Sequence, residues 1–164
     1  MRSNRRVVVE TPDSMRDVGA ALGRVARAGD VVVLTGDLGA GKTTLTQGIA
    51  AGLGVTDHVT SPTFVIARIH ANPGGGPVLI HVDAYRLGSV NEVDDLDLEH
   101  DLAEGVVVVE WGEGLVDDLS DSRAHVVIER SDEADDERRV VSVSAPDPRW
   151  EAALENLGLR EAGR

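Results

Sequence analysis

Nine residues decide the fold of this chain: Gly36-Asp37-Leu38-Gly39-Ala40-Gly41-Lys42-Thr43-Thr44. They follow the apolar run 31–34 and fill the pattern G-x-x-x-x-G-K-S/T without a gap. Successive backbone N–H groups must turn inward to wrap a triphosphate, and glycine tolerates the positive φ and the close approach that this requires. A glycine-rich turn that binds nothing is the alternative, but an expected strand before it and an expected helix after it favour a nucleoside triphosphate-binding loop.

The side chains of this loop fit the same ligand. Lys42 brings a point charge to the outer phosphates, and Thr43 offers a hydroxyl group to Mg²⁺. The helix that is expected to start near Lys42 adds the positive end of its dipole to the same anion. The loop therefore predicts a bound nucleoside triphosphate with Mg²⁺.

Composition indicates one globular domain. The chain has 164 residues, of which 41% are hydrophobic and 27% charged, so one domain with a real core is expected at 7–158, between a flexible segment 1–6 and a tail 159–164. The absence of cysteine excludes disulfides and Cys-based zinc sites and fits a reducing cytoplasm. No apolar stretch approaches the roughly 20 residues that span a bilayer, so no membrane association is expected.

The charge of the chain argues against direct binding of nucleic acid. Its formal net charge is −13, and its arginines are spread along the sequence. Such a protein repels phosphate backbones unless its basic groups gather on one face. If an RNA is involved, a partner protein should hold it.

Hydrophobic patterns predict alternating strands and helices. Strands are expected at 6–10, 30–35, 63–70, 78–83, 105–110, 124–129 and 139–144, and helices at 12–28, from 42 to about 51 and at 148–157. The glycine-rich stretch 72–77 is expected to be a surface loop joining two strands of a hairpin. The acidic stretch 89–104 is interpreted as one or two short helices with a solvated face, with a metal cluster as the alternative. The fold class is α/β: a single-domain, P-loop NTPase-like sandwich with a mixed, mainly parallel sheet flanked by helices.

Two carboxylates end apolar strands and are candidates for the Mg²⁺ shell. Glu110 follows four valines and Asp83 ends the strand at 78–83, so both are expected where ligands of open α/β sheets bind. An ordinary charged residue at a strand end is the alternative for Glu110, and the sequence does not rank the two carboxylates. His81 shares a strand face with Asp83 by alternation and could be either structural or functional.

Four motifs in order resemble the TsaE family, also called YjeE. They are the phosphate loop, Ser61-Pro62-Thr63-Phe64, His81-Val82-Asp83-Ala84-Tyr85-Arg86 and Glu110-Trp111, and the resemblance covers roughly residues 7–145. The family comprises small bacterial P-loop ATPases of tRNA threonylcarbamoyladenosine synthesis. The resemblance implies one α/β domain that works with two partner proteins, TsaD and TsaB. TsaD transfers the threonylcarbamoyl group to N6 of adenosine 37, so tRNA is reached through the partners.

The resemblance also implies roles for individual residues. Residues 39–44 would bind the phosphates of ATP, and Thr43 and Glu110 would bind Mg²⁺. Asp83 would assist in the metal shell or in catalysis, and Thr63 would act as a sensor of the γ-phosphate. ATP hydrolysis by the chain alone is expected to be slow and to reset the assembly between turnovers.

Other parts of the family pattern are less closely matched. By position, the segment Thr11–Ser14 resembles the family's stretch beside the adenine, although no motif fixes this. Gly112 stands where proline is common after the Glu-Trp pair, which is expected to loosen that turn. The glycine-rich loop 72–77 leaves its own conformation and any partner contact open.

Two alternative functions share the phosphate loop. A small-molecule kinase would also need an acceptor pocket and usually an arginine-bearing lid, for which only Arg130, Arg138 and Arg139 are near candidates. A nucleotide-dependent switch would act by binding alone, without hydrolysis. The guanine-reading motif N-K-x-D is absent, which favours adenine.

Overall fold

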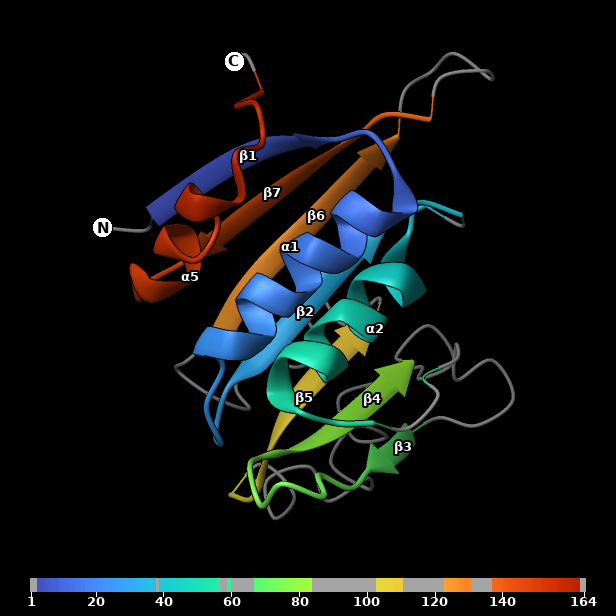
Figure 1. Ribbon diagram of the computed structural model, residues 1–164, viewed down its shortest axis with the longest axis vertical. Helices are drawn as coiled ribbons and strands as arrows, with labels where there is room; N and C mark the ends of the chain where they lie inside the picture. Colours follow the sequence, from blue (N-terminus) through green and yellow to red (C-terminus); the bar gives the residue numbers. More distant parts are fainter. Residues whose placement is uncertain are drawn as a thin grey trace, which may run out of the picture.

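One mixed sheet organises the described part of the chain. The computed structural model describes residues 3–37, 39–56, 59, 67–83, 103–110, 123–130 and 137–162. The strands are β1 (Ser3–Val9), β2 (Val31–Gly36), β3 (Ala67–His70), β4 (Val78–Asp83), β5 (Gly105–Glu110), β6 (Arg123–Arg130) and β7 (Arg139–Ala145). The helices are α1 (Pro12–Val25), α2 (Lys42–Leu53), α5 (Arg149–Ala152) and the 3₁₀ turn η2 (Glu155–Leu157). Figure 1 shows α1 and α2 side by side across one face of the sheet.

The sheet is parallel at its centre and antiparallel at its edges. Its strand order is β1-β7-β6-β2-β5-β4-β3. Strand β2 is parallel to β5 and β6, and β4 is parallel to β5, whereas β1, β7 and β3 join as antiparallel strands. The arrowheads of β4, β5 and β6 point toward the same edge in Figure 1. The predicted α/β fold with a mixed, mainly parallel sheet is confirmed.

Burial explains why these strands occupy their positions. The apolar strands β2 and β5 are almost wholly buried, as expected for central parallel strands that are covered on both faces. Strands β6 and β7 alternate between buried and partly exposed residues, which is typical of strands with one buried face. The core between the sheet and the helices therefore consists mainly of valine, leucine, isoleucine and alanine.

Helix α1 begins as predicted and ends earlier. Thr11 caps it by accepting the N–H of Ser14 at 3.0 Å, and proline follows at the first helical position. The predicted end near residue 28 is wrong, because the helix ends at Val25 and residues 27–30 form a turn into β2. The carboxylate of Asp30 accepts the N–H of Arg27 at 2.6 Å in this turn. Gly29, at φ 98°, donates to the carbonyl of Gly105 and does not cap the helix.

Two other local predictions have different outcomes. The hairpin at 72–77 is confirmed: it joins β3 to β4, and Asn72 organises it by donating to the carbonyls of Leu53 and Pro77. The single helix predicted at 148–157 is wrong, because the segment forms α5 and η2 separately, with i→i+3 bonds such as Leu154 N–H to Glu151 O. No helix of the described residues is long and apolar enough to cross a membrane.

Helices α1 and α2 pack closely because glycines face each other. Gly19 and Gly23 of α1, and Gly48 and Gly52 of α2, repeat at a spacing of four residues. A Cβ atom on Gly19 would overlap the carbonyl oxygen of Leu45 and lie 2.9 Å from the Cα atom of Gly48. The backbones therefore touch directly, and α2, which begins with the phosphate-loop lysine, is held firmly against α1.

We expect Gly48→Ala to destabilise the protein by about 1 to 3 kcal/mol, although alanine is the better helix former. The added methyl group meets backbone atoms of Arg16 and Gly19 and cannot move aside by a rotamer change. Urea unfolding measures the loss. Gly74→Ala is the matched control, because its Cβ atom would meet only Asn72 Oδ1 at 3.5 Å. Equal unfolding midpoints for both variants and the wild type would show that the helices are not in close contact.

Candidate functional site

The phosphate loop joins the end of β2 to the start of α2. Gly39 and Gly41 have φ angles of 80° and 112°, which only glycine adopts without strain. Gly41 is the N-cap residue of α2, and no side chain caps this helix end. The N–H groups of the first helical turn are therefore directed at the loop mouth, as in anion sites at helix N-termini. Leu38 is also predicted to belong to the loop, but it lies outside the described residues.

Lys42 is fixed at this mouth by the loop itself. Its side chain is buried, with 7% of the residue exposed. Its Nζ atom donates to the carbonyl oxygens of Gly36, at 2.5 Å, and of Asp37, at 3.2 Å. The ammonium group thus lies against the loop backbone, where it can exchange a carbonyl contact for a phosphate oxygen.

The threonines of α2 have different environments. Thr43 and Thr44 are half-buried, whereas Thr46 is fully buried and donates its hydroxyl to the carbonyl of Lys42 at 2.8 Å. Thr46 therefore supports the helix backbone directly behind the lysine. The sequence did not single it out, since a threonine four residues after a lysine carries no recognisable signal.

A pocket of about 210 Å³ opens beside the loop. Its lining includes predicted site residues from the start of α1 and from the phosphate loop, namely Thr11, Gly39, Ala40, Gly41 and Thr44. Pro12, which belongs to the proposed adenine stretch, and Arg139, which is a lid candidate only in the kinase alternative, also line it. Val9, Met15 and Glu137 were not predicted. The structure therefore brings the proposed adenine stretch at the start of α1 and the phosphate loop to the same pocket.

Glu110 ends β5 beside the phosphate-loop strand. It lies opposite Leu34 of β2 and opposite Asp83 of β4 in the parallel register. Only 5% of Glu110 is exposed, and its Oε2 atom lies 2.9 Å from Nε2 of the fully buried His81. Because a carboxylate only accepts, His81 donates from Nε2. The Nδ1 atom of His81 has no hydrogen-bond partner among the described residues.

Three predicted positions are only partly placed or not placed. The backbone of Asp83 ends β4 directly opposite Glu110, so the two strand ends meet as expected. The side chain of Asp83, and all of Ser61-Pro62-Thr63-Phe64 with the proposed sensor Thr63, lie outside the described residues. Within the described part of the chain, no group of three or more His, Cys, Asp or Glu side chains could hold a metal ion by itself.

Comparison with known families decides the relationship. The family model described as "Threonylcarbamoyl adenosine biosynthesis protein TsaE" matches residues 9–140. The chain belongs to the TsaE family.

Named relatives of the TsaE family match across most of this chain. The tRNA threonylcarbamoyladenosine biosynthesis protein TsaE of Streptomyces coelicolor is 53% identical over 141 residues, covering 85% of this chain and 95% of its own. The TsaE protein of Bacillus subtilis is 40% identical over 150 residues, covering 92% and 91%. The crystal structure of YdiB from Bacillus subtilis matches with a TM-score of 0.71 and 31% identity, over 96% of this chain and 95% of that one.

Membership of the TsaE family agrees with the geometry of the site. The family match includes the phosphate loop, the start of α1 and the ends of β4 and β5. These are the segments that the structure gathers at one edge of the sheet. The TsaE resemblance inferred from four short motifs is therefore confirmed.

Proposed function

We propose that this chain is a Mg²⁺-dependent ATPase that serves tRNA threonylcarbamoyladenosine biosynthesis together with TsaD and TsaB. One observation carries the proposal: the phosphate loop and the buried carboxylate Glu110 lie at the carboxyl ends of two paired parallel strands, β2 and β5. Leu34, two residues before the loop begins, is directly opposite Glu110. This is the arrangement that P-loop ATPases use to hold a triphosphate and its metal ion.

The oxygen ligands that the site can offer suit Mg²⁺ better than they suit a metal ion that is coordinated by protein side chains alone. Mg²⁺ usually keeps several waters and is bound by one or two protein oxygens together with substrate phosphates. The hydroxyl of Thr43 and the carboxylate of Glu110 would supply these oxygens, and Asp83 would join them directly or through water. Held by these residues, the ion would supply positive charge against the negative charge of the outer phosphates.

The residues of the chain itself have separable tasks in this proposal. The loop N–H groups and Lys42 bind and orient the phosphates, while the pocket beside Thr11 and Met15 receives the nucleoside. His81 donates to Glu110 and thereby holds one carboxylate oxygen, leaving the other for the metal shell or for a water molecule. Thr63 would sense the γ-phosphate, as the family resemblance implies.

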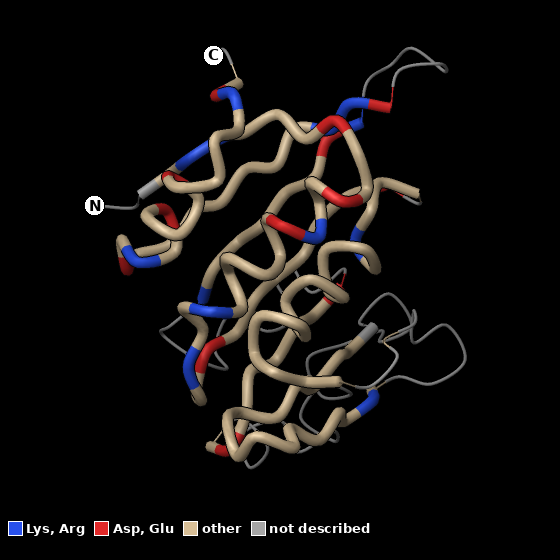
Figure 2. Tube along the Cα trace, viewed as in Figure 1, with Lys and Arg blue, Asp and Glu red and all other residues tan. Residues whose placement is uncertain are grey.

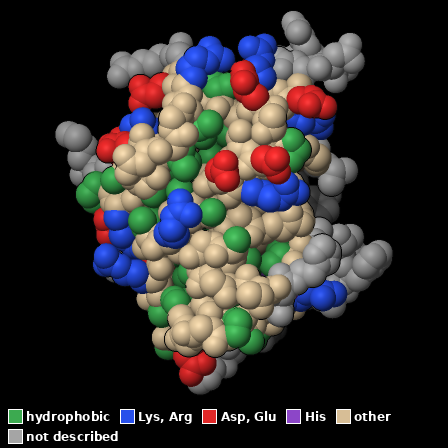
Figure 3. All heavy atoms as spheres, viewed as in Figure 1, with side chains coloured by type: hydrophobic (Ala, Val, Ile, Leu, Met, Phe, Trp, Pro, Cys, Tyr) green, Lys and Arg blue, Asp and Glu red, His purple; other side chains and the backbone are tan. Residues whose placement is uncertain are grey.

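The distribution of charge supports a role for partner proteins in holding the tRNA. Acidic and basic residues are interspersed along the described trace in Figure 2 and on the face shown in Figure 3. With a net charge of −13, direct binding of tRNA is disfavoured. Electrostatic attraction to a basic partner would instead speed assembly. Mixing the chain with TsaB and TsaD should therefore raise both ATP turnover and tRNA modification, and no stimulation of either would refute the proposal.

We expect Glu110→Gln to lower kcat for ATP hydrolysis by about 10²-fold while ATP still binds, because a neutral amide replaces the anionic oxygens that would hold Mg²⁺ or orient a water molecule. Glutamine keeps the size of the side chain and can still accept from His81. Glu104→Gln is the matched control, since Glu104 is exposed beyond the opposite end of β5. Hydrolysis is measured by phosphate release, with and without TsaB and TsaD.

The same variant separates hydrolysis from switching. If the Glu110→Gln assembly still modifies tRNA at the wild-type rate without hydrolysing ATP, the chain acts by nucleotide binding alone. If this variant hydrolyses ATP at the wild-type rate, Glu110 takes no part in the proposed site.

A further inference from the structure

Two arginines, of which Arg139 lines the pocket, lie in one row across the sheet. In the antiparallel registers, Val9 of β1 lies opposite Arg139 of β7, and Arg139 lies opposite Arg130 of β6. The row therefore runs from the strand that leads into Thr11 toward the strand beside the phosphate loop. Neither arginine belongs to any of the motifs that identified the family.

Arg130 reaches the phosphate loop because β6 continues beyond β2. Ile128 of β6 is opposite Gly36, the last residue of β2, so Arg130 follows at the level of the loop itself. A Cβ atom built on Gly39 would lie only 3.2 Å from Nη1 of Arg130. The guanidinium group thus packs against the glycine that opens the inner turn of the loop.

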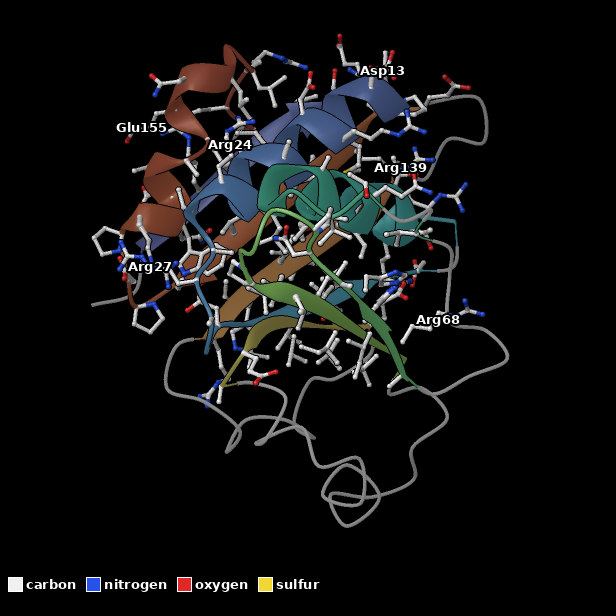
Figure 4. All side chains as sticks on the ribbon, turned by 60° about the horizontal axis from the view of Figure 1, so that its bottom comes forward. Asp13, Arg24, Arg27, Arg68, Arg139 and Glu155 are labelled. Carbon is white, nitrogen blue, oxygen red and sulfur yellow. The ribbon has the colours of Figure 1, made fainter. Side chains whose placement is uncertain are left out.

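Arg139 lines the pocket. It shares the pocket with Thr44 of α2 and with Met15 of α1, so it faces the space between the phosphate loop and the proposed nucleoside site. Figure 4 shows Arg139 on the same side of the molecule as Asp13, at the start of α1. Arg24 and Arg27 lie toward the other end of that helix.

We infer that Arg130 and Arg139 are nucleotide-binding residues, which give an otherwise acidic protein a cationic wall at this site. The inference rests on the proposed function and extends it to specific contacts. The Arg139 guanidinium would contact the nucleotide at the junction of phosphate and nucleoside, and Arg130 would add positive charge beside the outer phosphates. Guanidinium groups suit this task because their fork of donors matches phosphate oxygens. The ligand class is a nucleoside di- or triphosphate.

The test is the affinity of purified variants for Mg-ATP and Mg-ADP, measured by calorimetry in the absence of partners. Arg139→Ala should weaken ATP binding about tenfold, which corresponds to about 1.4 kcal/mol. Arg130→Ala should weaken ATP binding by several-fold and ADP binding less, because it lies beside the outer phosphates. Arg139→Lys should recover part of the affinity, since it restores the charge without the fork.

Two controls show whether the effect belongs to these positions. Arg24→Ala removes an exposed arginine near the far end of α1 and should leave ATP affinity within about twofold of the wild type. Arg27→Ala removes a second exposed arginine toward that end of α1, away from the pocket, and should likewise leave ATP affinity within about twofold of the wild type. Thermal unfolding of each variant confirms that the folded state is retained.

The outcomes distinguish this inference from the proposed function. If the wild type binds no adenine nucleotide, the proposed function fails. If the wild type binds ATP and the folded Arg139→Ala and Arg130→Ala variants bind it equally well, only the arginine wall is refuted. Equal weakening by Arg24→Ala would also refute it, because the effect would then reflect net charge alone.

Discussion

Replacing Lys42 with alanine is expected to lower kcat/KM for ATP hydrolysis by at least about 10³-fold, because a charged hydrogen-bond donor at the phosphates acts in both binding and the transition state. The buried Nζ atom already lies at the loop mouth, held by the carbonyls of Gly36 and Asp37. The alanine variant has no side-chain cation in the first turn of α2. Phosphate release and calorimetric binding of ATP measure the two contributions separately.

Lys42→Arg is the informative control for this prediction. It keeps the charge, but a planar guanidinium cannot fit the site that the two loop carbonyls form around a compact ammonium group. We therefore expect it to hydrolyse ATP poorly as well. Loss of activity in the alanine variant with full activity in the arginine variant would mean that only charge matters there.

A labelling experiment tests the same lysine without changing it. Lys42 is the only lysine in the sequence. An amine-directed reagent should therefore modify one side chain, and Mg-ATP should protect it from modification. Mass spectrometry reads the extent of labelling. Equal labelling with and without saturating Mg-ATP would place the triphosphate elsewhere.

The centre of the fold could be predicted because its signals are local. The apolar runs of β2 and β5 are long enough to indicate buried parallel strands, and the glycine pattern between β2 and α2 specifies a phosphate loop. Glu110 is predicted as a site residue because it ends one of these runs. No long-range pairing had to be known for these three inferences.

The contacts around the site could not be predicted because they depend on strand register. His81 and Glu110 are 29 residues apart, and only the β4–β5 register brings their side chains together. Arg139 reaches the pocket through the pairing of β7 with β1, which no single-strand pattern reveals. The glycine spacing in α1 and α2 was visible in the sequence, but its meaning appears only when the two helices are seen in contact.

The last turn of α1 was misplaced for a related reason. Gly29 is a typical helix stop signal, yet its positive φ serves the turn into β2. What ends the helix earlier is the Asp30 carboxylate, which accepts the N–H of Arg27 and pairs with Arg149. A contact across 119 residues of sequence thus sets a helix boundary.

That contact leads to a large expected effect on stability. Arg149 holds Asp30 through two hydrogen bonds of 2.7 and 2.8 Å, donates to the carbonyl of Val25 and packs over the ring of Trp150. The side chains of Arg149 and Asp30 are 14% and 5% exposed. Burial alone would lower the pKa of Arg149, but its hydrogen bonds to Asp30 and Asp147 outweigh this and raise that pKa. We expect Arg149→Ala to reduce the free energy of unfolding by about 3 to 5 kcal/mol, because it leaves the buried carboxylate of Asp30 without its cationic partner.

The exposed partner of Arg149 provides the matched control. The backbone N–H and then the side chain of Arg149 lower the pKa of Asp147. A lowered pKa in the folded state contributes stability above the unfolded-state pKa of about 3.9, and this contribution is lost as pH falls through the folded-state pKa. Asp147→Asn should therefore destabilise far less than Arg149→Ala at pH 7, and its difference from the wild type should shrink below about pH 4.

Urea unfolding at pH 7 tests the buried clamp that Arg149 and Asp30 form. ATP binding by the folded Arg149→Ala variant shows whether this clamp also affects the site. Because Arg149 joins the end of α1 to the start of β2, while the pocket lies at the other end of α1, its loss should lower stability without changing ATP affinity. Arg149→Lys should fall between the wild type and alanine, since lysine keeps the charge but cannot bind both Asp30 oxygens in parallel. A loss below about 1 kcal/mol for Arg149→Ala would match an exposed ion pair and contradict the buried clamp.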